Sequence, residues 1–141
     1  MSAEQNKSIV RRWVEEGWNK KNTIALIDEL YAPNYYQHEA GPEMATSREG
    51  MQQFAAMYLT AFPDLSFTSD DLVAEGDKVT WRFVATGTNE GSLMGAPASG
   101  KVAKVAGIII FRLENSRIAE GWLSMDVLGL LQQVGIIPAM A

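Results

Sequence analysis

The hydrophobic pattern of this sequence changes its period at Pro63, and this change constrains the fold more than any other feature. Before Pro63 the apolar residues recur every three or four positions, which is typical of amphipathic helices. After Pro63 they recur about every second position, which is typical of half-buried strands. Helices and strands are therefore segregated along the chain, and this order predicts an α+β fold.

Three helices are expected before Pro63. Ser2 and Gln5 have the spacing of a capping box, in which each side chain binds the free backbone N–H of the other residue, so a helix begins there. A polar loop with Gly and Pro is expected between the second helix and the third. The expected helices run from Ser2 to Asn19–Asn22, from Thr23 to the stop at Pro33, and from Ser47 to about Ala61, with the loop over Gln37–Thr46.

About four long strands are expected after Pro63, and a short helix or turn over Val127–Val134 ends the pattern. The short turns between long strands favour a curved antiparallel sheet. The expected strands begin near Leu65 and cover Lys78–Thr86, Lys101–Leu113 and Arg117 to about Met125. The length of 141 residues is that of one domain and no linker composition divides it, so residues 1–141 are expected to form a single domain.

The composition excludes several kinds of chemistry. The chain has no cysteine and one histidine, His38, which excludes disulfides, thiol nucleophiles, cysteine-ligated zinc and any metal site that needs two imidazoles. The net charge of −5 and the lack of a long basic run argue against nucleic acid as a partner. Because no apolar run is long enough to span a bilayer or to serve as a secretion signal, we expect a cytoplasmic protein without a membrane partner.

The last expected strand carries the most informative polar residues. Its alternation places on one face Ile118, Glu120, Trp122, Ser124 and Asp126. If this face is the one that the helices cover, Asp126 lies in apolar surroundings that would raise its pKa towards that of a useful general base. The alternative is that Asp126 caps the helix that follows, and capping does not exclude catalysis.

His38 and Arg82 each allow two interpretations. As the only imidazole, His38 could transfer protons at a pocket rim, or it could simply hydrogen-bond a loop carbonyl or a carboxylate. Arg82 could bind an anionic group or pair with Glu120, or it could be a solvated residue on the outer face of the sheet. The tryptophans and methionines would suit a broad apolar cavity, although such residues more often form an ordinary core.

Several short motifs together resemble the SnoaL-like polyketide cyclase family of the nuclear transport factor 2-like superfold. The resemblance runs from about residue 6 to residue 136 and implies a cone, in which helices fill the concavity of a bent sheet around one deep apolar pocket, often as a homodimer. The motifs are Trp18-Asn19-Lys20, Leu30-Tyr31-Ala32-Pro33 to His38, Phe62-Pro63-Asp64-Leu65, Glu75-Gly76-Asp77-Lys78-Val79, Gly87-Thr88, Gly100-Lys101, and Glu120-Gly121-Trp122 with Asp126.

The resemblance also implies an activity, a cofactor-free intramolecular aldol condensation that closes a ring in an apolar polyketide-like ligand. An isomerase, a dehydratase, an epoxide hydrolase or a non-catalytic binding protein on the same fold is the alternative. Relatives often carry histidine where this chain has Asn89 and Gly121, and asparagine can donate a hydrogen bond but cannot transfer a proton. The expected site has Asp126 and His38 as catalytic residues, Trp122, Arg82, Trp18, Phe54, Met51 and Asn89 as substrate-binding residues, and neither a metal nor a cofactor.

Overall fold

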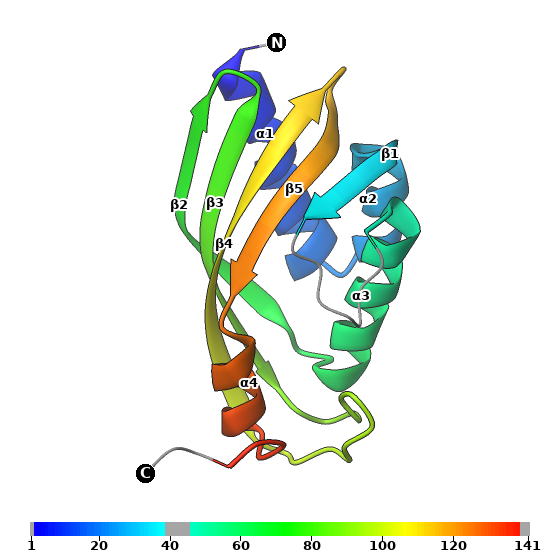
Figure 1. The fold of residues 1–141 in the computed structure, drawn as a ribbon, viewed down its shortest axis with the longest axis vertical. Helices are drawn as coiled ribbons and strands as arrows, with labels where there is room; N and C mark the ends of the chain where they lie inside the picture. Colours follow the sequence, from blue (N-terminus) through cyan, green and yellow to red (C-terminus); the bar gives the residue numbers. More distant parts are fainter. Residues whose placement is uncertain (1, 39–45, 139–141) are drawn as a thin grey trace.

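The computed structural model describes residues 2–38 and 46–138, and its elements follow the expected order with one addition (Figure 1). The helices are α1 (Ala3–Arg12), α2 (Thr23–Leu30), α3 (Arg48–Ala61) and α4 (Val127–Gln133), and a π-helical segment, η1 (Trp13–Asn19), continues α1. The strands are β1 (Tyr31–His38), β2 (Ser66–Glu75), β3 (Lys78–Thr88), β4 (Val102–Glu114) and β5 (Arg117–Met125). None of the helices in these two ranges has the length and apolar character needed to cross a membrane.

Side-chain hydrogen bonds begin α1 and α3 where the sequence predicts. The Ser2 hydroxyl accepts a hydrogen bond from the Gln5 backbone N–H at 3.1 Å, and the Gln5 side chain accepts one from the Ser2 N–H at 2.8 Å. The Ser47 hydroxyl accepts the Gly50 N–H at 3.1 Å. These bonds satisfy backbone N–H groups that the first helical turn leaves free, so the predicted capping box is confirmed.

The π-helical segment brings two tryptophans to the same side of the N-terminal helix. In a π-helix each backbone hydrogen bond joins residues that are five positions apart. Trp13 and Trp18 have this separation, so they lie about one turn apart. Their ring centroids lie 5.4 Å apart, and both side chains are buried. Gly17 lies against the Trp13 ring, where a β-carbon would clash with it. Both indoles can therefore pack between the helices and the sheet.

The strands form one sheet in the order β1-β5-β4-β3-β2. The neighbouring strands β2 and β3, β3 and β4, and β4 and β5 pair antiparallel, as expected. β1 is an additional strand that pairs parallel to β5, so the sheet is mixed and the expected all-antiparallel sheet is wrong at this edge. Pro33 indicates the end of a helix in the sequence, but proline is also tolerated on an edge strand, which pairs on one side only.

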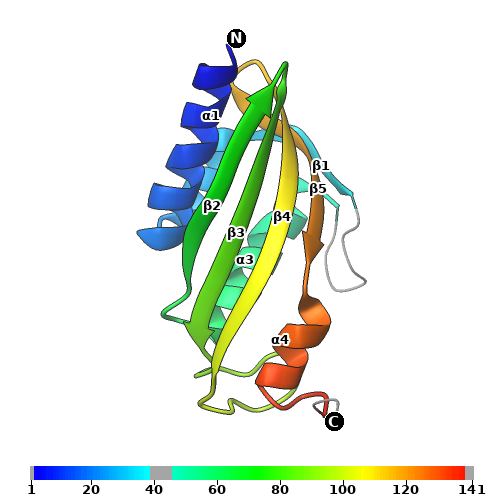
Figure 2. The ribbon, with the colours of Figure 1, turned by 90° about the vertical axis from the view of Figure 1, so that its left-hand side faces the viewer.

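The three helices α1, α2 and α3 cover the concave face of the curved sheet, and α4 lies at one end of it beyond β5 (Figures 1 and 2). Burial alternates accordingly along β3, where Val79, Trp81 and Phe83 are buried while Lys78 and Arg82 are exposed. The hydrophobic core lies between the helices and this concave face. The predicted arrangement of three N-terminal helices packed against a bent sheet is therefore confirmed.

The face assigned to the polar residues of β5 differs from the expectation. Glu120 and Trp122 pair across the ladder with Arg112 and Ile110 of β4, which lie on the outer face. Ile118 is fully buried, because the pairing of β4 with β5 shifts by one residue before Glu120. Alternation shows which residues share a face and does not show which face the helices cover, and a one-residue shift in pairing reverses the alternation.

Candidate functional site

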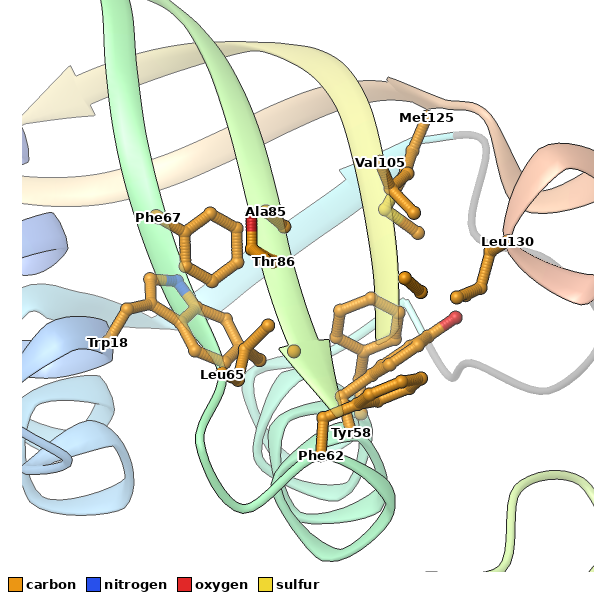
Figure 3. A pocket seen from close by; sticks show the side chains of 13 residues that line it. Trp18, Tyr58, Phe62, Leu65, Phe67, Ala85, Thr86, Val105, Met125 and Leu130 are labelled. Atoms are coloured by element: carbon orange, nitrogen blue, oxygen red, sulfur yellow. The ribbon is translucent and has the colours of Figure 1, made fainter. Parts of the chain in front are cut away.

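An apolar cavity lies between the helices and the concave face of the sheet, and it has two adjoining parts. The part near α4, here called the α4-side chamber, has a cavity volume of about 50 Å3 and is partly open to solvent. Its wall combines residues from η1, α3, β5 and α4 with the ends of β3 and β4 (Figure 3). The wall includes Trp18, Phe54, Tyr58, Phe62, Met125 and Leu130.

The second part, here called the β1-side chamber, lies farther along the sheet from α4, and its cavity volume is also about 50 Å3. It shares Trp18, Phe54, Phe67 and Met125 with the α4-side chamber, so the two parts are contiguous. Its own wall includes Trp13, Tyr31, Gln37, Met51, Trp81 and Leu123.

Aromatic rings make up much of both walls. The Trp18 ring lies 4.9 Å from the Phe67 ring, and the Phe67 ring lies 5.3 Å from that of Trp81. On α3, Phe54 and Tyr58 are one turn apart with their ring centroids 4.8 Å from each other. Such rings offer large, rigid apolar surfaces, which suit a flat apolar or aromatic ligand.

The polar side-chain groups of the cavity are hydroxyls, indole N–H groups and one amide. Neither chamber is lined by an Asp, Glu, His, Lys or Arg among the residues that the structure describes. In the α4-side chamber the Tyr58 hydroxyl points toward Leu130 of α4 (Figure 3). Burial raises the pKa of Tyr58 above its ordinary value, so its hydroxyl stays protonated and can donate a hydrogen bond.

Asp126 lies at the junction of β5 and α4, at the α4 end of the cavity. It directly follows Met125 and precedes Leu130 by about one helical turn, and both of these line the α4-side chamber. Its Oδ1 accepts a hydrogen bond from the Gly129 N–H at 2.9 Å, so Asp126 caps α4. The side chain is exposed, and the expected apolar enclosure of this carboxylate is wrong.

His38 lies on the outer side of the sheet and not in the cavity. Its Nε2 is 2.5 Å from Glu120 Oε2, while Glu120 Oε1 accepts a hydrogen bond from Arg112 Nε at 2.8 Å. The imidazole stacks on Trp122, with the ring planes 1° apart and the centroids 4.9 Å apart. The hydrogen bonds from Arg112 and His38 lower the pKa of Glu120. Of the two interpretations of His38, the structure supports the hydrogen bond to a carboxylate.

Arg82 also lies on the outer face. Its Nε donates to Asp71 Oδ2 at 2.6 Å, and its Nη1 lies 3.4 Å from Asp70 Oδ2. More than half of its side chain is exposed. The solvated interpretation is therefore confirmed, and the expected pair with Glu120 is not formed. Neither Arg82 nor Trp122 lines the cavity.

Asn89 organises the loop between β3 and β4 and lines neither chamber. Its side chain is 1% exposed and makes hydrogen bonds at both ends. The amide nitrogen donates to the Gly91 carbonyl at 2.8 Å, and the oxygen accepts from the Ser99 N–H and hydroxyl, each at 2.9 Å. These bonds close the loop against the end of α3, where the Glu90 N–H donates to the Ala61 carbonyl.

The structure thus brings together three of the expected binding residues. Trp18 and Phe54 line both chambers, and Met51 lines the β1-side chamber. Tyr58 and Gln37 also line the cavity, although neither was expected as a site residue from the sequence. Tyr58 was recognisable from its position one turn after Phe54 on the buried stripe of α3, whereas Gln37 falls in a segment expected to be a loop.

Comparisons with known proteins agree with this architecture. A family model described as SnoaL-like polyketide cyclase matches residues 8–134. The structure is similar to that of TsrD from Streptomyces laurentii, with 31% identity, coverage of 97% of this chain and 99% of that one, and a TM-score of 0.84. It is similar to IdmH from Streptomyces antibioticus, described as a candidate polyketide cyclase, with 28% identity, coverage of 93% and 99%, and a TM-score of 0.80.

A third similar structure, AclR from Streptomyces galilaeus, has 24% identity, coverage of 99% and 87%, and a TM-score of 0.87, and this likeness shows the fold alone. A search of the curated proteins found no match.

Proposed function

Because the chain belongs to the SnoaL-like polyketide cyclase family, we propose that it closes a ring in an apolar, polyketide-like substrate by a cofactor-free aldol condensation. The observation that carries this proposal is the aromatic cavity whose α4-side wall includes Met125 and Leu130, since Asp126 directly follows Met125 in the chain and caps the helix that carries Leu130. The aromatic walls bind and orient the substrate, and the carboxylate at the end of the cavity removes a proton. Isomerase, dehydratase or epoxide hydrolase chemistry is the alternative use of the same base. The homodimer expected above stays a prediction.

In the proposed reaction Asp126 acts first as a base. Its Oδ1 is held by the Gly129 N–H, which fixes the carboxylate and leaves Oδ2 without a hydrogen-bond donor among the described residues. A substrate carbon between two carbonyl groups is already acidic, so one carboxylate can remove its proton without a metal or a Schiff base. The C–H bond breaks, its electron pair forms an enolate, and the proton is transferred to Asp126.

Ring closure then forms one carbon–carbon bond. The enolate carbon attacks a second carbonyl of the same substrate, whose oxygen becomes an alkoxide and takes the proton back from Asp126. The Tyr58 hydroxyl lies on the α4 side of the same chamber and stays protonated because it is buried (Figure 3). As a hydrogen-bond donor in an apolar site, it can stabilise the negative oxygen that forms.

The test is the variant Asp126→Asn, with Glu120→Gln as the matched control. Asparagine also caps helices well, so Asp126→Asn should fold and bind ligand like the wild type while lacking the base. Glu120→Gln removes a carboxylate from the outer face. With aromatic polyketide esters as substrates, we expect Asp126→Asn to lower kcat by about a hundredfold or more and the control to leave it unchanged. Wild-type turnover in Asp126→Asn would overturn the assignment.

A non-catalytic binding protein is the second candidate, and one observation favours it. Asp126 is exposed and already caps α4, and the described cavity wall carries no carboxylate or imidazole. On this alternative the wild type would bind apolar ring compounds in the cavity and release them unchanged. Product analysis after incubation with the same esters distinguishes the two functions.

A further inference from the structure

The inner face of β1 holds a buried amide whose donors are poorly satisfied. The Gln37 side chain lines the β1-side chamber, and the residue is 1% exposed. Its Oε1 accepts a hydrogen bond from the Tyr35 hydroxyl. Its Nε2 has one long contact, 3.4 Å to the His38 carbonyl, and this leaves the second N–H without an acceptor among the described residues. A buried donor without an acceptor is costly, so a ligand that supplies one gains affinity.

The neighbouring strand makes room for this amide and holds it in place. Gln37 pairs with Gly121 of β5 in the ladder. A β-carbon at position 121 would clash with the Tyr35 hydroxyl and come within 3.1 Å of Gln37 Oε1. The glycine therefore permits the Tyr35–Gln37 hydrogen bond, which fixes the oxygen of the amide and so directs its nitrogen.

A second donor lines the same chamber. Tyr31 is 1% exposed, and its hydroxyl has no hydrogen-bond partner among the described residues. Its ring is held edge-on between Trp13, at 5.2 Å, and Tyr35, at 4.7 Å. Burial raises the pKa of Tyr31 well above its ordinary value, so the hydroxyl remains a donor at neutral pH.

We propose that Gln37 Nε2 and the Tyr31 hydroxyl form a subsite in the β1-side chamber that binds a carbonyl oxygen of an otherwise apolar, ring-containing ligand. Both groups can donate, and a carbonyl oxygen has two lone pairs to accept with. The subsite rests on the proposed function, because it needs a ligand in the cavity. It specifies the ligand further, since an oxygen bound at β1 directs the opposite end of a multi-ring molecule towards α4 and Asp126.

The experiment compares 9-fluorenone with fluorene, two tricyclic compounds that differ by the carbonyl oxygen. Their dissociation constants are measured by isothermal titration calorimetry with the wild type, Gln37→Leu and the control Gln53→Leu, which changes an exposed glutamine on α3. We expect the wild type and the control to prefer fluorenone by about tenfold, as one good hydrogen bond to a buried donor provides. Gln37→Leu should weaken this preference, because only the Tyr31 hydroxyl remains to donate, and should keep its affinity for fluorene.

Each outcome has a defined meaning. A preference for fluorenone that is undiminished in Gln37→Leu, or that the wild type lacks, overturns the subsite and leaves the proposed function standing. Failure of the wild type to bind either compound overturns both. If Gln37→Leu does not fold, Tyr31→Phe provides the same comparison, because it removes one hydroxyl and keeps the ring. Selective weakening of fluorenone binding in Tyr31→Phe supports the subsite, and equal weakening of both compounds contradicts it.

Discussion

The two faces of the sheet differ in chemistry although they alternate residue by residue along the same strands. The concave face and its helices surround an aromatic cavity whose polar side-chain groups are uncharged, namely hydroxyls, indole N–H groups and one amide. The outer face carries the charged pairs of the sheet, among them Arg82 with Asp71 and Arg112 with Glu120. His38, whose imidazole often takes part in catalysis, lies on this outer face and pairs with Glu120. A residue type that suits catalysis therefore identifies a site only when the strand presents it to the cavity.

The largest expected difference between the faces is in stability. Phe111 and Ile110 are neighbours on β4, but Phe111 is 1% exposed on the concave face and Ile110 is 36% exposed on the outer face. We expect Phe111→Ala to lower the free energy of unfolding by about 3–5 kcal/mol, through lost burial and a cavity left behind. Ile110→Ala should cost less than about 2 kcal/mol, because its side chain remains partly in water. Urea denaturation measures both, and equal losses would contradict the assignment of faces.

The second prediction concerns two tyrosine hydroxyls, one on α3 in the cavity and one on the outer face of β1. Tyr58→Phe should lower kcat on aromatic polyketide esters by about tenfold, because one hydrogen bond to the developing oxyanion is lost. Tyr36→Phe removes an exposed hydroxyl from β1 and should leave kcat unchanged. A Tyr58→Phe enzyme with wild-type kcat would remove the hydroxyl from the proposed reaction, and equal losses in both variants would argue against the cavity as the place of reaction.

The parts of the fold and of the site that the sequence predicts are those set by local patterns, and the parts it misses depend on contacts between distant residues. The capping box at Ser2, the start of a helix at Ser47 and the short turns that join β2 to β3 and β4 to β5 are local patterns, and the structure confirms them. β1 was missed because Pro33 has the same local meaning at the end of a helix and on an edge strand. Gln37 became a cavity residue only through the pairing of β1 with β5, which joins residues about 84 positions apart in the chain and leaves no local pattern.

The third prediction is that the stability contributed by a carboxylate of the outer face, Glu120, depends on pH. Hydrogen bonds from Arg112 and His38 lower the pKa of Glu120 in the folded protein. A lowered pKa means that the ionised group stabilises the fold above its unfolded pKa of about 4.3 and loses this contribution as the pH falls through the lower folded value. The melting temperature should therefore be higher in the wild type than in Glu120→Gln at pH 7, and the difference should shrink as the pH falls below about 4.3.

The matched control for this pH dependence is Glu90→Gln, which changes an exposed glutamate in the loop after β3. Its melting curve should follow that of the wild type across the range. A gap between the wild type and Glu120→Gln that is constant with pH would show that the ionised form of Glu120 does not stabilise the fold.

The smallest effect is expected for Arg82. Its pairs with Asp70 and Asp71 lie on the exposed outer face, and such pairs contribute about 0–1 kcal/mol. Arg82→Ala should change the free energy of unfolding by no more than this and leave fluorenone affinity unchanged. A large loss of affinity would restore Arg82 as a binding residue and require a ligand site on the outer face.

The placement of the ligand on the concave face is tested most directly by methyl NMR of the wild type titrated with 9-fluorenone. Ile109 points into the β1-side chamber, whereas its neighbours Ile108 and Ile110 are exposed on the outer face. The predicted result is large, saturable shifts for the methyl groups of Ile109, Val105 and Leu130, with those of Ile108 and Ile110 nearly unchanged. Saturable shifts confined to Ile108 and Ile110 would contradict the placement of the site in the cavity.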